Sequence, residues 1–212
     1  MIYIFNRMDL VTDTFINDFL PNMPIERQDR TLRYRRKIDR DLCVIGYWLL
    51  CYGLRKEYGI TDYPRLLYGD YGKPHLTDYP DIHFNISHCN IGVACAISQN
   101  EVGVDIQDVQ HYNANVAKRI CTDEEMAQLT QCQHPEALFC RLWTIKESFL
   151  KQFGASIECL ENKASAEWLM SQAPGYVFTH WGEGYNLCCF GGERDISFVE
   201  KLVELFNCSK LK

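Results

Sequence analysis

The sequence predicts an α+β fold built from two similar halves. Two observations lead to this prediction. The same order of patterns, a strand, a long helix and two more strands, occurs twice along the 212 residues. No low-complexity linker separates the two occurrences, so the halves, residues 1–100 and 101–212, are expected to pack closely along a shared seam.

The first half opens with residues 1–5, whose β-branched and aromatic side chains favour a strand. Residues 36–58 follow a helical pattern with few polar positions, and Gly59 ends it. Residues 82–88 alternate between apolar and polar side chains as a strand does, and residues 91–97 form the next strand. The long helix is therefore expected to be mostly buried.

The second half repeats this order, beginning with a strand over residues 101–107. Residues 122–125 have the pattern of a capping box, which opens a short helix. A long helix over residues 135–154 begins at a proline and stops at a glycine. Residues 176–181 and 185–190 follow as strands. Apolar residues at helical spacing predict a last helix that covers the core: Phe198, Val199, Leu202, Val203 and Phe206.

Composition indicates a globular protein in a reducing, intracellular compartment. The chain is 47% hydrophobic and 13% aromatic, which excludes disordered and fibrous classes. Its longest apolar region, residues 42–54, is shorter than the roughly 20 residues that cross a bilayer. The first residues show no secretory pattern, so we expect a cytoplasmic protein. The eleven cysteines include no Cys-x-x-Cys spacing, which argues against a zinc site.

One basic segment contrasts with the net charge of -6. It is either a solvated face or a binding site for an anion such as a phosphate. A third reading, a nucleic-acid binder, predicts steeply salt-dependent binding and is disfavoured by the acidic total. The seven basic residues are Arg27, Arg30, Arg33, Arg35, Arg36, Lys37 and Arg40.

The second long helix carries charges on one side of an otherwise apolar pattern. Trp143, Glu147 and Lys151 are spaced by four and share a face, with Lys146 at its edge. The simplest interpretation is an exposed ion pair between Glu147 and Lys151, worth about 0.2 to 0.5 kcal/mol. A second acidic site meeting Glu147 around a metal would give the helix a catalytic role instead.

Asp105 and Gln107 supply such a site. They point to the same side of a strand, roughly 6.6 Å apart, while Val104 and Ile106 face the core. With Glu147 they offer the oxygen ligands that Mg²⁺ prefers. The alternative is that Asp105 and Asp108 merely terminate a strand.

Several side chains could hold the anion of such a site. Lys73 lies on a turn stiffened by a proline, and Ser87 and His88 close a strand with a hydroxyl and an imidazole. Together with Lys146, Lys151 and the basic segment, this set matches a multiply charged ligand.

Four motifs occur in a recognisable order: Tyr-Gly-Lys-Pro at 71–74, Phe-Asn-Ile-Ser-His at 84–88, Gly-Val-Asp-Ile at 103–106 and Trp-Thr-Ile-Lys-Glu-Ser-Phe-Leu-Lys at 143–151. With these motifs the chain resembles the 4'-phosphopantetheinyl transferases of the surfactin-synthetase-activating (Sfp) type. The resemblance covers residues 27–154 directly. It implies a pseudo-symmetric α+β fold, each half a long helix on a small, mainly antiparallel sheet, with coenzyme A and the active site in the seam.

The resemblance implies a Mg²⁺-dependent enzyme, a holo-[acyl-carrier-protein] synthase. It would transfer phosphopantetheine from coenzyme A to a serine of an acyl or peptidyl carrier protein and release adenosine 3',5'-bisphosphate. The first half would contact the nucleotide phosphates, and the second would supply the metal site and the catalytic helix. We expect a monomer that spans no membrane and binds no nucleic acid. The rival function is a non-catalytic coenzyme A or carrier-protein binding module with the same fold.

The resemblance also implies roles for single residues. Asp105 and Glu147 would hold the metal, and Glu147 would accept the serine proton. Lys151 and Lys146 would offset phosphate charge. Many relatives have Glu where this chain has Gln107, which keeps an oxygen ligand but loses a charge. Lys73, Ser87, His88 and Arg40, and more weakly Arg27, would hold the nucleotide, while Asn85 and Trp143 would shape the site.

Overall fold

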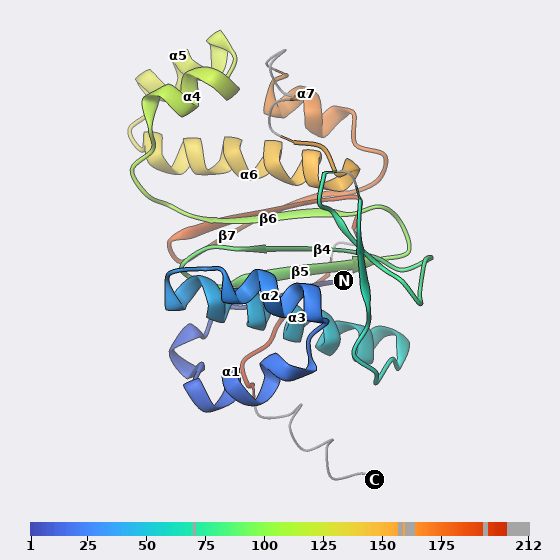
Figure 1. Cartoon of the computed structure of the whole chain (residues 1–212). Coiled ribbons are helices and arrows are strands. Elements are labelled where there is room, and N and C mark those ends of the chain that lie inside the picture. Colours follow the sequence, from blue (N-terminus) through green and yellow to red (C-terminus); the bar gives the residue numbers. More distant parts are fainter. Residues whose placement is uncertain (70, 157–158, 160–163, 193–194, 203–212) are drawn as a thin grey trace.

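The chain folds into layers in the order helix, sheet, sheet, helix (Figure 1). The computed structural model describes residues 1–212 apart from 70, 157–158, 160–163, 193–194 and 203–212. Helix α3 (Lys37–Tyr58) covers one side of the paired sheets, and α6 (Pro135–Phe153) covers the other. The predicted α+β class is therefore confirmed.

The first sheet has the strand order β4-β5-β1-β9, with β1 antiparallel to β5 and parallel to β9. Its strands are β1 (Ile2–Phe5), β4 (His83–His88), β5 (Val93–Ser98) and β9 (Ile196–Phe198). Every residue of β1 is buried because Tyr3 and Phe5 pack in the α3 core while Ile2 and Ile4 pack toward the second sheet. A strand covered on both faces explains the continuous apolar run.

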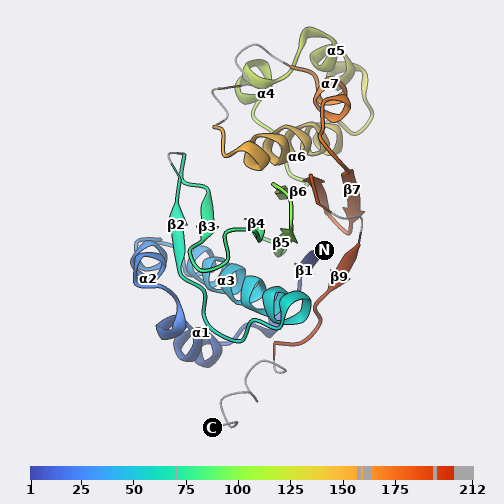
Figure 2. The same ribbon diagram turned by 90° about the vertical axis from the view of Figure 1, so that its right-hand side faces the viewer.

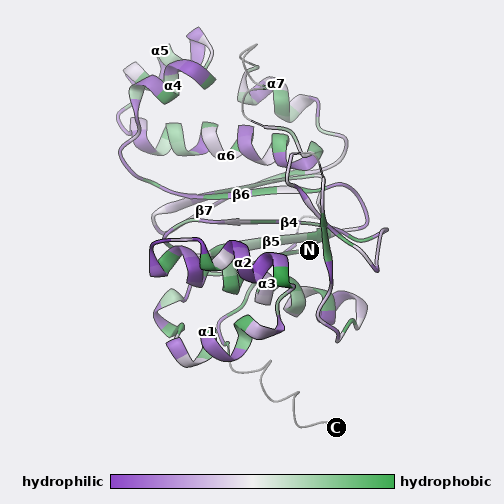
Figure 3. Cartoon of the chain, in the orientation of Figure 1, coloured by the Kyte–Doolittle hydropathy of each residue, from purple (hydrophilic) through white to green (hydrophobic). Residues whose placement is uncertain are grey.

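Helix α3 is apolar on most sides because it lies between the first sheet and the helices before it. It ends at Gly59, whose φ of 68° is in the left-handed region that glycine adopts without strain. The outer elements are the 3-10 turns η1 (Met8–Leu10) and η2 (Leu20–Asn22) and the helices α1 (Asp13–Phe19) and α2 (Ile25–Leu32). Figure 3 shows hydrophilic residues along α2, in front of α3.

A small hairpin of β2 (Leu66–Tyr68) and β3 (Pro74–Leu76) connects α3 to β4. It stands at the side of the sheets, and its turn reaches toward the end of α6 (Figure 2). Gly154 follows α6 at this point, and a Cβ placed there would lie 3.3 Å from the Lys73 side chain. The hairpin thus joins the two halves.

The second sheet has the order β6-β8-β7, with both pairs antiparallel. Its strands are β6 (Gly103–Asp108), β8 (Tyr185–Phe190) and β7 (Val177–Gly182). Outside α6 lie α4 (Ala114–Ile120), α5 (Asp123–Gln131) and α7 (Ala166–Ser171). Thr122 and Glu125 form the predicted capping box of α5. Val104 and Ile106 are fully buried between the sheets, as expected.

One predicted element is wrong. Phe198 lies in β9, where Ile4 of β1 is its partner, and not in a helix. Long-range pairing with the first strand overrides the local helical spacing here. Val199 and Leu202 are buried in the α3 core, and Val203 and Phe206 lie outside the described residues. Among the described residues, no helix is long and apolar enough to cross a membrane.

Candidate active site

The site lies where β6 passes under α6. The contact is very close at Gly103, where an added Cβ would lie 2.1 Å from the backbone oxygen of Ser148 and 2.2 Å from the backbone nitrogen of Gln152. Only glycine allows this approach of helix to strand. It brings Asp105, two residues further along β6, to the charged face of α6.

Asp105 is 4% exposed and binds two side chains through one of its oxygens. Its Oδ1 accepts hydrogen bonds from Lys151 Nζ at 2.6 Å and from Ser87 Oγ at 2.7 Å. Lys151 also donates to Ser87 at 3.1 Å. The other oxygen, Oδ2, is buried with no hydrogen-bond partner. Such an atom loses its hydration without replacement, which favours binding of a cation there.

Asn85 fixes this part of β6 to the first sheet. Its buried Oδ1 accepts a hydrogen bond from the backbone nitrogen of Val104 at 3.0 Å, one residue before Asp105. β4 therefore positions Ser87 and β6 positions Asp105 within one connected unit. Asn85 thus holds the backbone next to the Asp105 carboxylate.

Glu147 lies one helical turn before Lys151 and is half-buried on the same face of α6. Two carboxylates and the Gln107 amide thus supply the oxygen donors near the seam. Among the described residues, no group of three or more His, Cys, Asp or Glu side chains could hold a metal. A cation with few protein ligands, completed by water and phosphate, fits this donor set and the unpartnered Oδ2.

A polar hollow of about 240 Å³ lies next to the ion pair of Asp105 and Lys151, and Lys151 is one of its lining residues. Arg27, 7% exposed, lines the hollow; its guanidinium lies over the ring of Tyr47 and donates from Nη2 to the backbone oxygen of Cys43 at 3.4 Å, while its Nε has no hydrogen-bond partner. The lining residues include Arg27, Arg30, Tyr68, Tyr71, His88 and Lys151. Arginine, lysine and histidine converging on one hollow are suited to phosphate groups.

His88 lines this hollow at the end of β4. Desolvation, followed by the positive charges of Lys151 and Arg27, lowers the pKa of His88 below its usual value. The imidazole is therefore neutral near pH 7 and gains a proton more readily when an anion enters.

Comparison with known proteins identifies the family. Residues 101–199 match a family model described as the 4'-phosphopantetheinyl transferase superfamily. A 4'-phosphopantetheinyl transferase of Bacillus subtilis is 34% identical over 168 residues, which cover 77% of this chain and 73% of the relative. The chain belongs to the 4'-phosphopantetheinyl transferase superfamily. It is thus a transferase that moves phosphopantetheine from coenzyme A to a carrier protein.

Two other transferases of this family show the extent of the similarity. The 4'-phosphopantetheinyl transferase Sfp of Bacillus subtilis is 29% identical over 191 residues, covering 84% of this chain and 85% of the relative. The transferase gsp of Aneurinibacillus migulanus is 34% identical over 147 residues, covering 67% of this chain and 61% of the relative. The similarity therefore extends over both halves.

In this transferase Lys146 is not part of the phosphate hollow, which corrects its predicted role. Its ammonium is fully buried and donates to Glu125 Oε2 at 2.6 Å and to the backbone oxygens of Ile120 and Ala164 at 2.7 and 2.9 Å. One helical position, about 100°, separates Lys146 from Glu147 and turns it toward α5 and α7. Lys146 holds the outer helices on α6.

Lys73 and Arg40 also use their charged groups within the protein. Lys73 lines the hollow, but its ammonium donates to Glu101 Oε2 at 2.6 Å and to the backbone oxygens of Val102 and Gln152 at 3.2 and 2.5 Å. An ammonium has three donors, so all are occupied. Arg40 donates to the backbone oxygens of Tyr34 and Arg35 at 3.1 and 3.4 Å and does not line the hollow.

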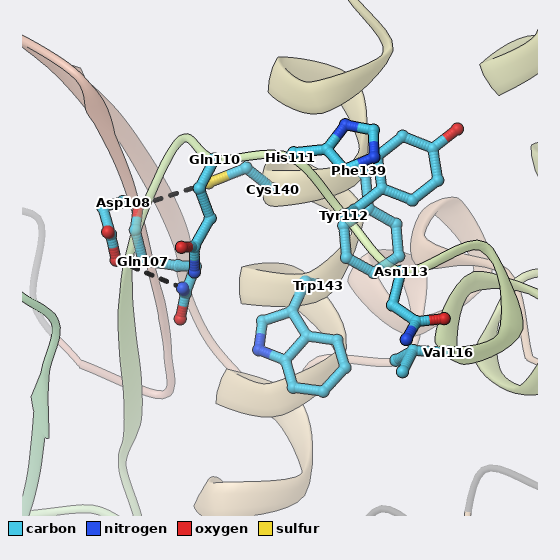
Figure 4. A pocket seen from close by; sticks show the side chains of 10 residues that line it. All are labelled: Gln107, Asp108, Gln110, His111, Tyr112, Asn113, Val116, Phe139, Cys140 and Trp143. Carbon is cyan, nitrogen blue, oxygen red and sulfur yellow. Dashed lines mark hydrogen bonds between the residues drawn. The ribbon is translucent and has the colours of Figure 1, made fainter.

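A second, more apolar hollow of about 200 Å³ lies at the Trp143 end of the same face of α6 (Figure 4). Tyr112 and Phe139 stack in it with ring centres 4.7 Å apart. Its remaining lining includes Gln107, Asp108, Val116 and Cys140. Tyr112 and Phe139 were not predicted as site residues because isolated aromatic residues carry no motif. Tyr71 was not predicted either, although it opens one of the motifs.

Proposed function

We propose that the seam between β6 and α6 carries the transfer, with coenzyme A phosphates in the polar hollow and Mg²⁺ held by Asp105, Glu147 and Gln107. The observation that carries this proposal is the buried Asp105 carboxylate, which has Lys151 on one oxygen and no partner on the other. When bound, Mg²⁺ supplies positive charge against the pyrophosphate as its anhydride bond breaks.

Side chains of this protein carry out the proton transfer and hold the phosphates. Glu147 accepts the proton of the carrier serine, directly or through a water, as the serine oxygen bonds to the phosphorus that carries pantetheine. The bond between that same phosphorus and the bridging oxygen breaks, and adenosine 3',5'-bisphosphate leaves with this oxygen and the bonding electrons. Lys151, Ser87 and His88 bind the phosphate oxygens and orient the anhydride. Arg27 anchors the nucleotide end.

The two hollows support a direction of approach for the carrier protein. Lys151 lines the polar hollow and Trp143 lines the apolar one, about 12 Å away along α6. Glu147 lies between them on the same face. Since the phosphates fit the Lys151 end, the serine of an acyl or peptidyl carrier protein enters from the Trp143 end.

In this proposal the protein is a monomer of two pseudo-symmetric halves, and each half supplies a different part of the site. Residues 1–100 supply nucleotide-phosphate contacts through Arg27, Ser87 and His88, and residues 101–212 supply the metal site and the catalytic helix. The matching positions of α3 and α6 on the outer sides of the sheets support it. Lys73 supports the hollow through the contacts that its ammonium makes in the protein.

Incubation of the protein with coenzyme A, Mg²⁺ and an apo-carrier protein tests this function. Mass spectrometry of the carrier should show the addition of one phosphopantetheine group, and chromatography should show an equal amount of adenosine 3',5'-bisphosphate. Glu147→Gln should slow transfer by about 10²-fold or more while coenzyme A still binds. Binding of coenzyme A by the wild-type protein without any gain in carrier mass would favour the binding-module alternative.

A further inference from the structure

The end of β6 carries a chain of polar contacts that crosses the seam. The amide nitrogen of Gln107 donates to Asp108 Oδ1 at 3.3 Å, as Figure 4 shows. The amide nitrogen of Asn90 donates to the other oxygen of Asp108 at 3.1 Å. Arg36, at the start of α3, donates in turn to Asn90 Oδ1 at 3.4 Å. Both oxygens of Asp108 are thus used, one from each half of the protein.

These contacts give the Gln107 amide a direction. An ionised carboxylate only accepts hydrogen bonds, so the amide can approach Asp108 only with its nitrogen. Its oxygen is then turned away from Asp108. Without this partner the amide would rotate about its last bond between two similar orientations. Asn90 holds Asp108 in place and so fixes the reference point for the amide.

We propose that Asp108 is a positioning residue of the metal site, which orients the Gln107 amide so that its oxygen serves as a cation ligand beside Asp105. The proposal rests on the proposed function, because it assumes a cation at Asp105 and Glu147. It explains how an uncharged side chain works where a carboxylate would bind metal in either orientation. Gln107 needs an external partner for this, and Asp108 is that partner.

The contact between Gln107 and Asp108 also makes glutamate unfavourable at position 107. A carboxylate at position 107 would face that of Asp108 at the distance of the present hydrogen bond, 3.3 Å. Two like charges at this separation repel strongly in a half-buried place. Glutamine at 107 and aspartate at 108 are therefore matched, and changing either one alone disturbs the site.

Cation binding without turnover tests the proposal. Mn²⁺ has the same preference for oxygen ligands as Mg²⁺, and its free fraction is measured by electron paramagnetic resonance with coenzyme A present and no carrier protein. Asp108→Asn should weaken Mn²⁺ binding by about three- to tenfold, a change in binding free energy of at most about 1.4 kcal/mol. Asn90→Ala should also weaken it, although this variant changes no charge.

A double-mutant cycle separates positioning from a simple effect of charge. If Asp108 acts through Gln107, then Asp108→Asn should add little to the weakening caused by Gln107→Leu. Asp62→Asn, an exposed carboxylate on the loop after α3, is the matched control and should leave Mn²⁺ binding unchanged. Circular dichroism melting of each variant checks that the fold is intact.

The outcomes distinguish two failures. If Asp108→Asn and Asn90→Ala bound Mn²⁺ with the affinity of the wild-type protein, Asp108 would have no positioning role. The metal site itself would not be affected by that result. Full additivity with Gln107→Leu would overturn the positioning role as well. If the wild-type protein bound no Mn²⁺, or bound it equally well with Asp105→Asn, the metal site of the proposed function would fall, and this inference with it.

Discussion

Lys151 and Asp105 form an ion pair across the seam, with Nζ 2.6 Å from Oδ1, while Oδ2 of the same carboxylate has no hydrogen-bond partner. The Lys151 side chain is 28% exposed and that of Asp105 only 5%. The ammonium therefore neutralises a carboxylate that water reaches poorly. A second cation at Oδ2 would also neutralise the carboxylate and would allow the Lys151 ammonium to contact a phosphate.

Replacing Lys151 tests this relationship. Lys151→Met leaves the Asp105 carboxylate with Ser87 alone, so we expect the free energy of unfolding to fall by about 1 to 3 kcal/mol. Mg²⁺ should raise the melting temperature of Lys151→Met more than that of the wild-type protein, because the ion replaces the lost charge. Lys118→Met, an exposed lysine on α4, is the control. An equal response to Mg²⁺ would show that no cation binds Asp105.

Replacing Lys146 should affect stability and not ligand binding. Lys146→Met leaves Glu125 buried without its partner, so we expect a loss of about 3 to 5 kcal/mol in urea unfolding. Coenzyme A affinity, measured by calorimetry at a temperature where the variant is folded, should stay within about twofold. Adding Glu125→Gln to Lys146→Met should recover part of the loss. A large drop in affinity alone would restore Lys146 to the phosphate site.

Lys73 and Arg27 should show opposite effects. Lys73→Met removes three hydrogen bonds inside the protein, so it should lower the free energy of unfolding by about 1.5 to 3 kcal/mol with little change in affinity for adenosine 3',5'-bisphosphate. Arg27→Met should weaken that affinity by about tenfold or more. Calorimetry and thermal melting of both variants measure the two quantities. The reverse pattern would place Lys73 on the phosphates.

His88 should make stability depend on pH. Its lowered pKa means that the unfolded chain, with an ordinary pKa of about 6.5, binds the proton more tightly. The contribution of neutral His88 is thus present above about pH 6.5 and is lost as the pH falls through the lowered pKa. The free energy of unfolding of the wild-type protein should therefore fall more steeply below about pH 6.5 than that of His88→Gln. Parallel curves would contradict this assignment.

Ligand binding should raise the pKa of His88 again. Phosphate groups favour the imidazolium, so coenzyme A binding near pH 6 should take up protons. Calorimetry in buffers of different ionisation enthalpy measures the uptake. The phosphate itself, whose second pKa is about 6, releases protons when it binds cationic side chains, so the difference between the wild-type protein and His88→Gln isolates the uptake by the imidazole. Equal uptake by the two proteins would exclude His88 from the phosphate site.

The fold was largely predictable because its signals are local. The bounds of α3 and α6 follow from glycines and a proline at their ends, and the strand β4 follows from alternation. The strand β9 could not be predicted this way. Its three residues are held by β1, nearly two hundred positions earlier, and no neighbouring residue reports that pairing.

The faces on which Asp105 and Lys151 lie could be predicted from the periods of strand and helix. Their direct contact with each other and with Ser87 was not predicted, because it depends on how α6 packs on β6. Lys146 was misassigned because a residue at the edge of a face turns toward whichever acceptor is nearest, here Glu125. The link between Gln107 and Asp108 was also missed, since neighbours on an ideal strand point to opposite sides.

The parallel pairing of β9 with β1 affects how the protein is made. Two backbone hydrogen bonds, from Ile2 N to Asp195 O and from Val199 N to Ile4 O, hold β1 to the residues just before and just after β9. A growing chain on the ribosome can form the α3 core early, but the outer edge of its first sheet stays open until residues 195–199 emerge. Until then, this edge is open to pairing with other nascent chains.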